Sequence, residues 1–223
     1  MKRIPLSINF FSQQLQQNKH YSFARYGDGE MAAILGHYIK NADGVVIDAS
    51  LQKQLAYVLL RQQPYYHGLL RIALTHYGPE IRKDWGFIAW YNGDMLLHQF
   101  LNGEGKPLLD QLQEKRILYV GAKHIKKLNL FPIVSYLETP ESTAHKLDYS
   151  GNVIDAVHKY NIDFVGYSAG MASNLWISRV YDELGTTITQ MDFGSLWDGF
   201  CGIVSRSYIK NTDFDKLKEL YKR

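Results

Sequence analysis

The sequence lacks the features that would place it in a membrane or in an oxidising compartment. Among its 223 residues there is one cysteine, Cys201, so no internal disulfide can form and a reducing compartment is favoured. No segment has the roughly 18 consecutive apolar residues of a membrane-spanning helix. Residues 1–17 lack the sustained apolar core of a signal peptide. We therefore expect a cytoplasmic protein without a transmembrane segment.

The chain also lacks an excess of charge of one sign and any linker-like segment. It carries 25 Lys and Arg against 22 Asp and Glu, a net charge of +3, with no dominant basic block. This balance argues against a nucleic-acid partner but suits a small anionic ligand. Because repeats, low-complexity tracts and Pro/Gly/Ser-rich linkers are also missing, residues 1–223 are expected to form a single domain.

What the sequence does contain is an alternation of strand-like and helix-like segments, typical of parallel βαβ units. It predicts an α/β fold: one Rossmann-like domain with a mainly parallel sheet flanked by helices. Strands are predicted over residues 21–27, 65–74, 116–121, 129–138, 162–168 and 186–194. Helices are predicted over residues 6–17, 28–36, 49–63, 92–103, 122–128, 150–160, 170–185 and 211–223. Ser7 is expected to cap the first helix, and a capping box from Thr212 to Asp215 the last.

Residues 166–170, Gly-Tyr-Ser-Ala-Gly, match the G-x-S-x-G nucleophile elbow between a strand and a helix. A serine hydrolase of that fold places its acid and its histidine after the serine, yet all eight histidines precede Ser168. The hydrolase therefore needs a permuted triad with His145 or His158, and it stays an alternative. The other interpretation is a small-residue turn that lets an anion approach a helix N-terminus.

A similar turn follows Gly121, where Lys123 and His124 come directly after a predicted strand. These residues can contact a diphosphate, or they can simply be solvated.

A third motif, Gly-Asp-Gly-Glu, follows the first predicted strand and places Asp28 and Glu30 two residues apart. Such a pair can hold Mg²⁺ or Mn²⁺ together with phosphate oxygens. Alternatively, Asp28 is an N-cap and Glu30 a partner of the helix dipole.

Two blocks of the chain resemble a known family. Residues 22–30, Ser-Phe-Ala-Arg-Tyr-Gly-Asp-Gly-Glu, are similar to the N-terminal signature of the GT-D-fold glycosyltransferases, a bacterial and phage family first known as a domain of unknown function. Residues 164–194 are similar to the family's strand, small-residue turn, long helix and final strand ending in Asp-x-Gly. The resemblance implies a GT-D fold and transfer of a sugar from a nucleotide donor, UDP-glucose in the best-known case.

The resemblance also implies site residues. Asp28 and Glu30 fall on the family's D-x-E motif, associated with a divalent metal, here Mn²⁺ or Mg²⁺. Asp192 falls on the Asp-x-Gly motif, and Ser195 stands where a histidine is common. The predicted catalytic residues are thus Asp28, Glu30 and Asp192, the first two also being metal ligands. The resemblance and the glycine turns together predict the residues that bind the donor. These are Arg25, Gly27, Gly29, Gly121, Lys123, Ser168, Gly170 and Gly194.

Arg25 has two possible roles: it can contact a phosphate of the donor, or it can hold Asp28 and Glu30 in place.

The acceptor site is predicted from a different segment. Residues 192–208 are rich in Gly, aromatic and polar side chains, and Trp197, Asp198 and Arg206 are predicted to line an acceptor site. The alternative for that segment is a loop packed on the sheet. An inverting transfer needs a base, for which Asp94, Asp192 and Asp198 are the candidates.

The sequence therefore predicts a metal-dependent glycosyltransferase that moves a glucose-like hexose from a UDP-sugar to a glycan, glycoprotein or surface-polymer acceptor. Besides the hydrolase, a non-catalytic nucleotide-sugar-binding module is the second alternative. The oligomeric state is not predicted.

Overall fold

One sheet organises the chain. The computed structural model describes residues 2–37, 48–140 and 144–222. They contain a seven-stranded sheet whose paired strands all run parallel, in the order β3-β2-β1-β7-β6-β4-β5. The strands are β1 Ser22–Tyr26, β2 Tyr65–Leu69, β3 Trp90–Asn92, β4 Ile117–Gly121, β5 Ser135–Glu138, β6 Phe164–Ser168 and β7 Thr189–Asp192. The predicted α/β fold with a mainly parallel sheet is confirmed.

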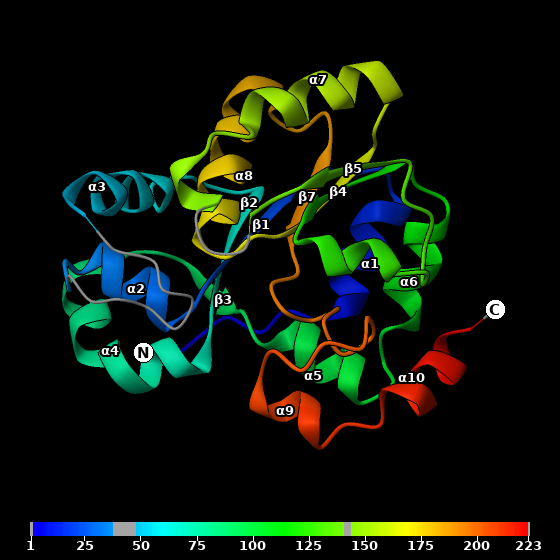
Figure 1. Cartoon of the computed structure of the whole chain (residues 1–223). Helices are drawn as coiled ribbons and strands as arrows, with labels where there is room; N and C mark the ends of the chain where they lie inside the picture. The colour runs from blue at the N-terminus through cyan, green and yellow to red at the C-terminus, as the bar shows by residue number, and fades with distance from the viewer. Residues whose placement is uncertain (1, 38–47, 141–143, 223) are drawn as a thin grey trace.

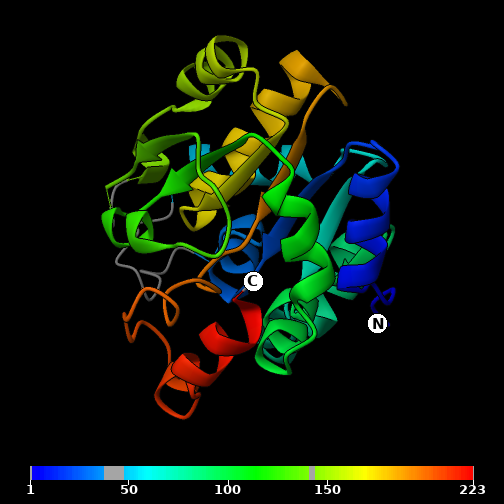
Figure 2. The ribbon, with the colours of Figure 1, turned by 90° about the vertical axis from the view of Figure 1, so that its right-hand side faces the viewer.

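Helices cover both faces of the sheet and form a three-layer sandwich (Figure 1 and Figure 2). One face carries α2 Asp28–Ile34, α3 Ala49–Val58, α4 Arg71–Trp85, α7 Ser150–Tyr160, α8 Met171–Leu184 and the 3-10 turn η2 Ala144–Lys146. The other carries α1 Ile8–Gln16, α5 Met95–Leu101, α6 Lys106–Gln113, α9 Ser207–Lys210, α10 Phe214–Tyr221 and the 3-10 turn η1 Lys123–Lys127. Among the described residues, no helix combines the length and apolar character needed to cross a bilayer.

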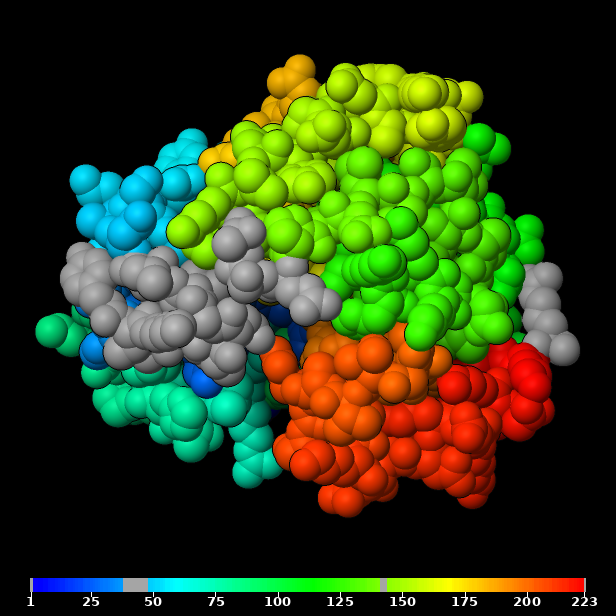
Figure 3. Space-filling model, viewed as in Figure 1, coloured from blue at the N-terminus to red at the C-terminus, as the bar shows by residue number. Residues whose placement is uncertain are grey.

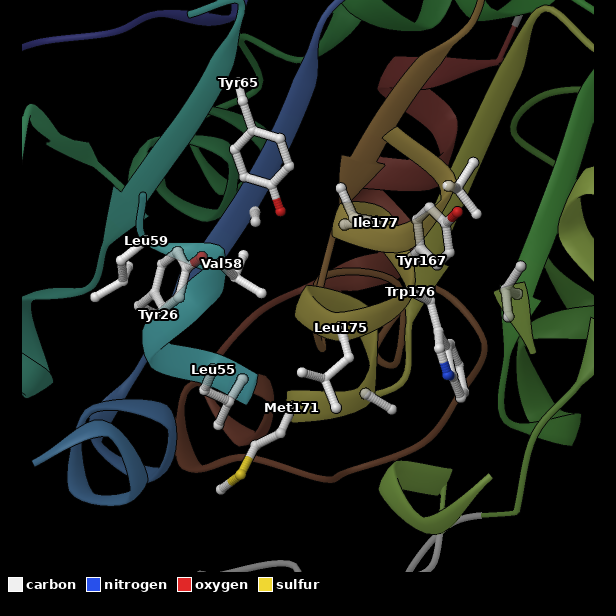
Figure 4. Packing of buried hydrophobic residues seen from close by; sticks show 14 of the residues in the cluster. Tyr26, Leu55, Val58, Leu59, Tyr65, Tyr167, Met171, Leu175, Trp176 and Ile177 are labelled. Atoms are coloured by element: carbon white, nitrogen blue, oxygen red, sulfur yellow. The ribbon is translucent and has the colours of Figure 1, made fainter. Parts of the chain in front are cut away.

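The position of α8 is set by the core (Figure 4). Leu55 and Val58 of α3 lie opposite Met171, Leu175 and Ile177 of α8, and all five side chains are buried. Burying each such side chain contributes about 1.5–3 kcal/mol relative to leaving it exposed. Because only two residues separate the end of β6 from the start of α8, this packing also fixes where the N-terminus of α8 lies relative to the sheet.

The predicted helix caps have different outcomes. The Ser7 cap is confirmed, since the Ser7 hydroxyl oxygen accepts a hydrogen bond from the Phe10 backbone N–H at 3.2 Å. The prediction of a capping box from Thr212 to Asp215 is wrong. Asp213 caps α10 by accepting from the Lys216 N–H at 3.0 Å, because the Thr212 hydroxyl is already bonded to the Tyr208 carbonyl.

Three segments differ from the sequence prediction. The strand predicted over 65–74 ends at Leu69, and α4 begins at Arg71 even though it contains Pro79. Residues 122–128 form a 3-10 turn, and the strand predicted over 129–138 covers only Ser135–Glu138. The sequence did not reveal β3, α4 or α6, because each depends on packing against neighbours that are distant in the chain.

Candidate active site

The carboxyl ends of the parallel strands gather at one edge of the sheet. The neighbouring strands β4 and β6 are connected in opposite directions along the sheet, because the chain runs from β4 to β5 at one end of the sheet and from β6 to β7 toward the other. The crevice between β4 and β6 is therefore a topological switch point. A pocket of about 390 Å³ opens at this edge. Its lining includes His124 after β4, Thr139 after β5, Gly170 after β6 and Ser195 after β7. Figure 3 shows a hollow bordered by the green and orange parts of the chain, with blue atoms at its floor.

Asp28 and Glu30 lie in the first turn of α2, just beyond β1. The Gly27 backbone N–H donates to Glu30 Oε2 at 2.8 Å, so one Glu30 oxygen is used by the helix N-terminus. The Asp28 side chain is 50% exposed, and its Oδ2 lies 3.9 Å from His76 Nδ1. The N-cap of α2 is Gly27, so the alternative prediction of Asp28 as N-cap is wrong, whereas the helix-terminus role of Glu30 is observed. Gly29 lies between the two acids in the same turn.

Asp192 ends β7 beside β1, close to Glu30. Its Oδ1 accepts from the Gly194 backbone N–H at 2.9 Å. Arg25 holds the same turn from β1, because its Nη1 donates to the Phe193 carbonyl at 2.7 Å. Gly194 has a φ of 54°, and a Cβ there would lie 2.5 Å from Arg25 Nη1. Glycine is therefore required at this position by both the backbone and the close guanidinium.

The predicted clamp between Arg25 and the two acids of α2 is not formed. Besides the Phe193 carbonyl, Arg25 donates from Nε to the Gly93 carbonyl at 3.1 Å. Within the described residues, it makes no ion pair with Asp28 or Glu30. Arg25 thus ties together the turns after β3 and β7 and adds positive charge next to Asp192.

The acids at this edge hold their protons unusually tightly. Burial raises the pKa of Glu30 to about 7, against the lowering effect of the backbone N–H groups of Glu30 and Gly27, and the charges of Asp192 and Asp28 raise it further. Burial also raises the pKa of Asp192 to about 6, opposed by Arg25 and by backbone N–H groups. In the described parts of the chain, no three His, Cys, Asp or Glu side chains form a group that could hold a metal ion by themselves. Asp28 and Glu30 supply two carboxylates, and a divalent cation held by one or two protein carboxylates takes its other ligands from phosphate and water.

These pKa shifts predict how stability changes with pH. We expect the melting temperature of chelator-treated protein to fall as pH rises from 4.5, the ordinary pKa of Glu, through about 7, the pKa of folded Glu30. In that window the folded state binds more protons than the unfolded state, so raising the pH favours unfolding. The fall is expected to be smaller in Glu30→Gln, measured by thermal unfolding across the window. An identical fall in both proteins would contradict the assignment.

The Ser168 turn does not have the geometry of a nucleophile elbow. The Ser168 hydroxyl lies 2.7 Å from the Tyr119 hydroxyl, and burial raises the pKa of Tyr119 well above its usual range, so this partner is no base. In the described ranges, the non-glycine residues with positive φ are Asn18 and Asn161, so Ser168 lacks the strained turn of the motif. The serine hydrolase alternative is therefore not supported.

The same turn suits an anion. Gly170, with a φ of 58°, is the N-cap of α8, and Gly170, Met171 and Ala172 line the pocket. The free N–H groups at a helix N-terminus and the helix dipole both favour negative charge there. Ser173 accepts one N–H, that of Ala169, at 3.0 Å. The positions of Ser168 and Gly170 are thus compatible with the donor-side role predicted for them.

Other predicted residues are placed elsewhere. Lys123 is exposed on η1 and does not line the pocket, and a Cβ at Gly121 would lie 3.2 Å from the Ser168 carbonyl, so this glycine allows close strand packing. Asp94 is paired with Arg3 and accepts from the Arg71 N–H at 2.9 Å. Asp94 therefore holds the start of α4, and this pairing argues against the role of base predicted for it.

The predicted acceptor wall is only partly formed. Trp197 is 0% exposed and lies in the core on the side of the sheet covered by α1, α5 and α6. The acceptor contact predicted for its ring is therefore corrected to a packing role. Arg206 and Asp198 do line the pocket. Asp198 accepts from His124 Nε2 at 2.8 Å and also from the Ser205 hydroxyl. The sequence alone places His124 only near a possible diphosphate, because Asp198, its hydrogen-bond partner, lies 74 residues away in the chain.

Comparison with known proteins identifies the fold. No protein-family model matches the chain, and no curated protein matches it significantly. Two solved structures do match, each over 97% of this chain and 93% of the other. One is a selenomethionine-substituted domain of unknown function 1792, with a TM-score of 0.64 at 16% identity. The other is a highly conserved domain of unknown function 1792 with a distinct glycosyltransferase fold, with a TM-score of 0.62 at 15% identity. The chain has this glycosyltransferase fold, as the resemblance in residues 22–30 and 164–194 predicts.

Proposed function

We propose that the protein is a metal-dependent glycosyltransferase that moves a glucose-like hexose from a UDP-sugar to a glycan, glycoprotein or surface-polymer acceptor. The observation that carries the proposal is the pocket faced by the N-terminus of α8 at the carboxyl edge of the sheet, the same edge at which Asp28 and Glu30 follow β1 and Asp192 ends β7. These three acids lie outside the pocket lining, and the charges of Asp28 and Asp192 act on Glu30. A site for a charged diphosphate needs both an anion-binding helix terminus and a means of neutralising the leaving group. This edge of the sheet offers both.

The pocket is suited to the donor. Its volume of about 390 Å³ lies within the usual range for small-molecule sites, roughly 300–1,000 Å³. The diphosphate is expected to lie against the N–H groups at Gly170 and Met171. Gly194 lines the pocket and lets the donor approach the backbone on the β7 side. Gly27 lies outside the lining, and a Cβ there would lie 3.1 Å from Glu30 Oε2.

Asp28 and Glu30 would hold the cation, because each has a carboxylate oxygen that the hydrogen bonds described above leave free. When bound, Mn²⁺ or Mg²⁺ would neutralise the charge that develops on the departing diphosphate. Asp192 lies next to Glu30 and, through Gly194, fixes the turn that borders the pocket. Arg25 positions the same turn rather than contacting the donor.

The test is UDP release from a panel of UDP-sugars, with and without Mn²⁺. We expect one donor to be hydrolysed slowly with water as acceptor, and the release to disappear in excess chelator. UDP binding without turnover of any donor would favour the non-catalytic binding module. Labelling of Ser168 by a fluorophosphonate probe, with no UDP release, would favour the hydrolase.

A further inference from the structure

We propose that His124 is the general base that removes the proton from the acceptor hydroxyl, and that Asp198 is the residue that positions it. This inference rests on the proposed function, and it names a group that the sequence did not place in that role. It begins from a hydrogen-bonded row of three side chains in the pocket wall: His124 from η1, and Asp198 and Ser205 from the segment after β7.

The carboxylate of Asp198 is fully engaged. Its Oδ1 accepts from His124 Nε2 at 2.8 Å, and its Oδ2 accepts from the Ser205 hydroxyl. The Asp198 side chain is 10% exposed and the His124 side chain 20%, and both line the pocket. A buried carboxylate held at both oxygens gives the imidazole a fixed orientation.

The pairing decides which nitrogen of His124 can act as a base. A carboxylate only accepts hydrogen bonds, so Nε2 carries the hydrogen and Nδ1 of the neutral ring keeps a lone pair. Among the described residues, none hydrogen-bonds to Nδ1. The arrangement is that of a base oriented by a third group, in the same pocket as the N-terminus of α8.

The proposed sugar transfer needs no reactant besides the donor, the acceptor and His124. The acceptor oxygen forms a bond to the anomeric carbon. At the same time the bond between that carbon and the diphosphate oxygen breaks, and its electron pair leaves with UDP. The hydroxyl proton passes to His124 Nδ1. The resulting imidazolium is stabilised by Asp198 and later returns its proton to water through the exposed part of the ring.

The other candidate bases are less well placed. Asp192 does not line the pocket, and its Oδ1 is held by the Gly194 N–H. His145 also lines the pocket, but within the described ranges no carboxylate hydrogen-bonds to it. The matched control is His98, which is exposed on α5 and lies outside the pocket lining. The charge of Asp198 acts on Tyr119, Cys201 and Tyr208. Arg206 and His145 line the same pocket, and Lys123, Lys126 and Lys127 share η1 with His124.

The experiment compares wild type, His124→Gln and His98→Gln with the donor that the panel identifies, Mn²⁺, and water as acceptor. We expect His124→Gln to lower kcat about 10²–10⁴-fold. It should also lose the rising limb that a general base gives to the pH profile of kcat. Affinity for UDP, measured by calorimetry, should be unchanged, and His98→Gln should keep the wild-type profile. Added imidazole should partly restore His124→Ala.

Three results would overturn the assignment. Wild type and His124→Gln with equal kcat and the same pH profile would remove His124 as the base while leaving the proposed function intact. Weakened UDP binding with the rising limb retained would make His124 a diphosphate ligand. No UDP release by wild type from any donor would overturn the proposed function itself. If His124→Gln fails to fold, Asp198→Asn is the second variant, and an unchanged pH profile in it counts against the pairing.

Discussion

Glu30→Gln is expected to lower Mn²⁺-dependent UDP release by about 10³-fold or more, because a catalytic metal contributes several kcal/mol of charge stabilisation in the transition state. The substitution is nearly isosteric. The glutamine carbonyl can still accept from the Gly27 N–H, so the first turn of α2 should persist. The loss is therefore expected in kcat and in Mn²⁺ affinity, with the fold preserved. UDP release and Mn²⁺ titration measure the two effects separately.

Two further variants sharpen that result. Glu219→Gln, an exposed residue on α10, applies the same chemical change far from the site and should leave UDP release unchanged. Asp28→Asn should resemble Glu30→Gln, since both acids are proposed to hold the same cation. If Glu30→Gln retained wild-type release and Mn²⁺ affinity, Glu30 would have only the helix-terminus role.

Trp197→Ala is expected to destabilise the protein by about 3–5 kcal/mol, the usual cost of truncating a buried Trp. Its ring packs against Phe193 and Phe100 at centroid distances of 5.0 Å, and against Phe131 and Phe200 at 5.6 and 5.7 Å. Removing the ring leaves a cavity that the surrounding aromatic side chains fill only in part. Urea unfolding of both proteins measures the difference.

Trp197→Phe is the matched variant. The indole Nε1 is buried and has no hydrogen-bond partner among the described residues, so the phenylalanine removes an unpaired donor while keeping one aromatic ring. Its loss of stability should be clearly smaller than that of alanine. If Trp197→Ala kept wild-type stability, the ring would not be the core element that its burial indicates.

Local sequence patterns determined much of this fold. The apolar runs of β4 and β6 need no distant information, because a strand covered on both faces is apolar throughout. The Ser7 cap depends on an N–H three residues away. Gly-Asp-Gly-Glu and the turn at Gly170 likewise lie within single strand–turn–helix units. Their shared place at the carboxyl edge follows from parallel strands alone.

The tertiary structure decided which side chains meet. Strand order places β7 between β1 and β6, and so brings Asp192 to Glu30. The fold of the segment after β7 turns Trp197 into the core and carries Asp198 to His124. Sequence periodicity reports which face of an element is apolar, but it does not report which distant loop covers that face. Burial, hydrogen-bond partners and raised pKa values arise from that covering, so they appear only when the chain is folded.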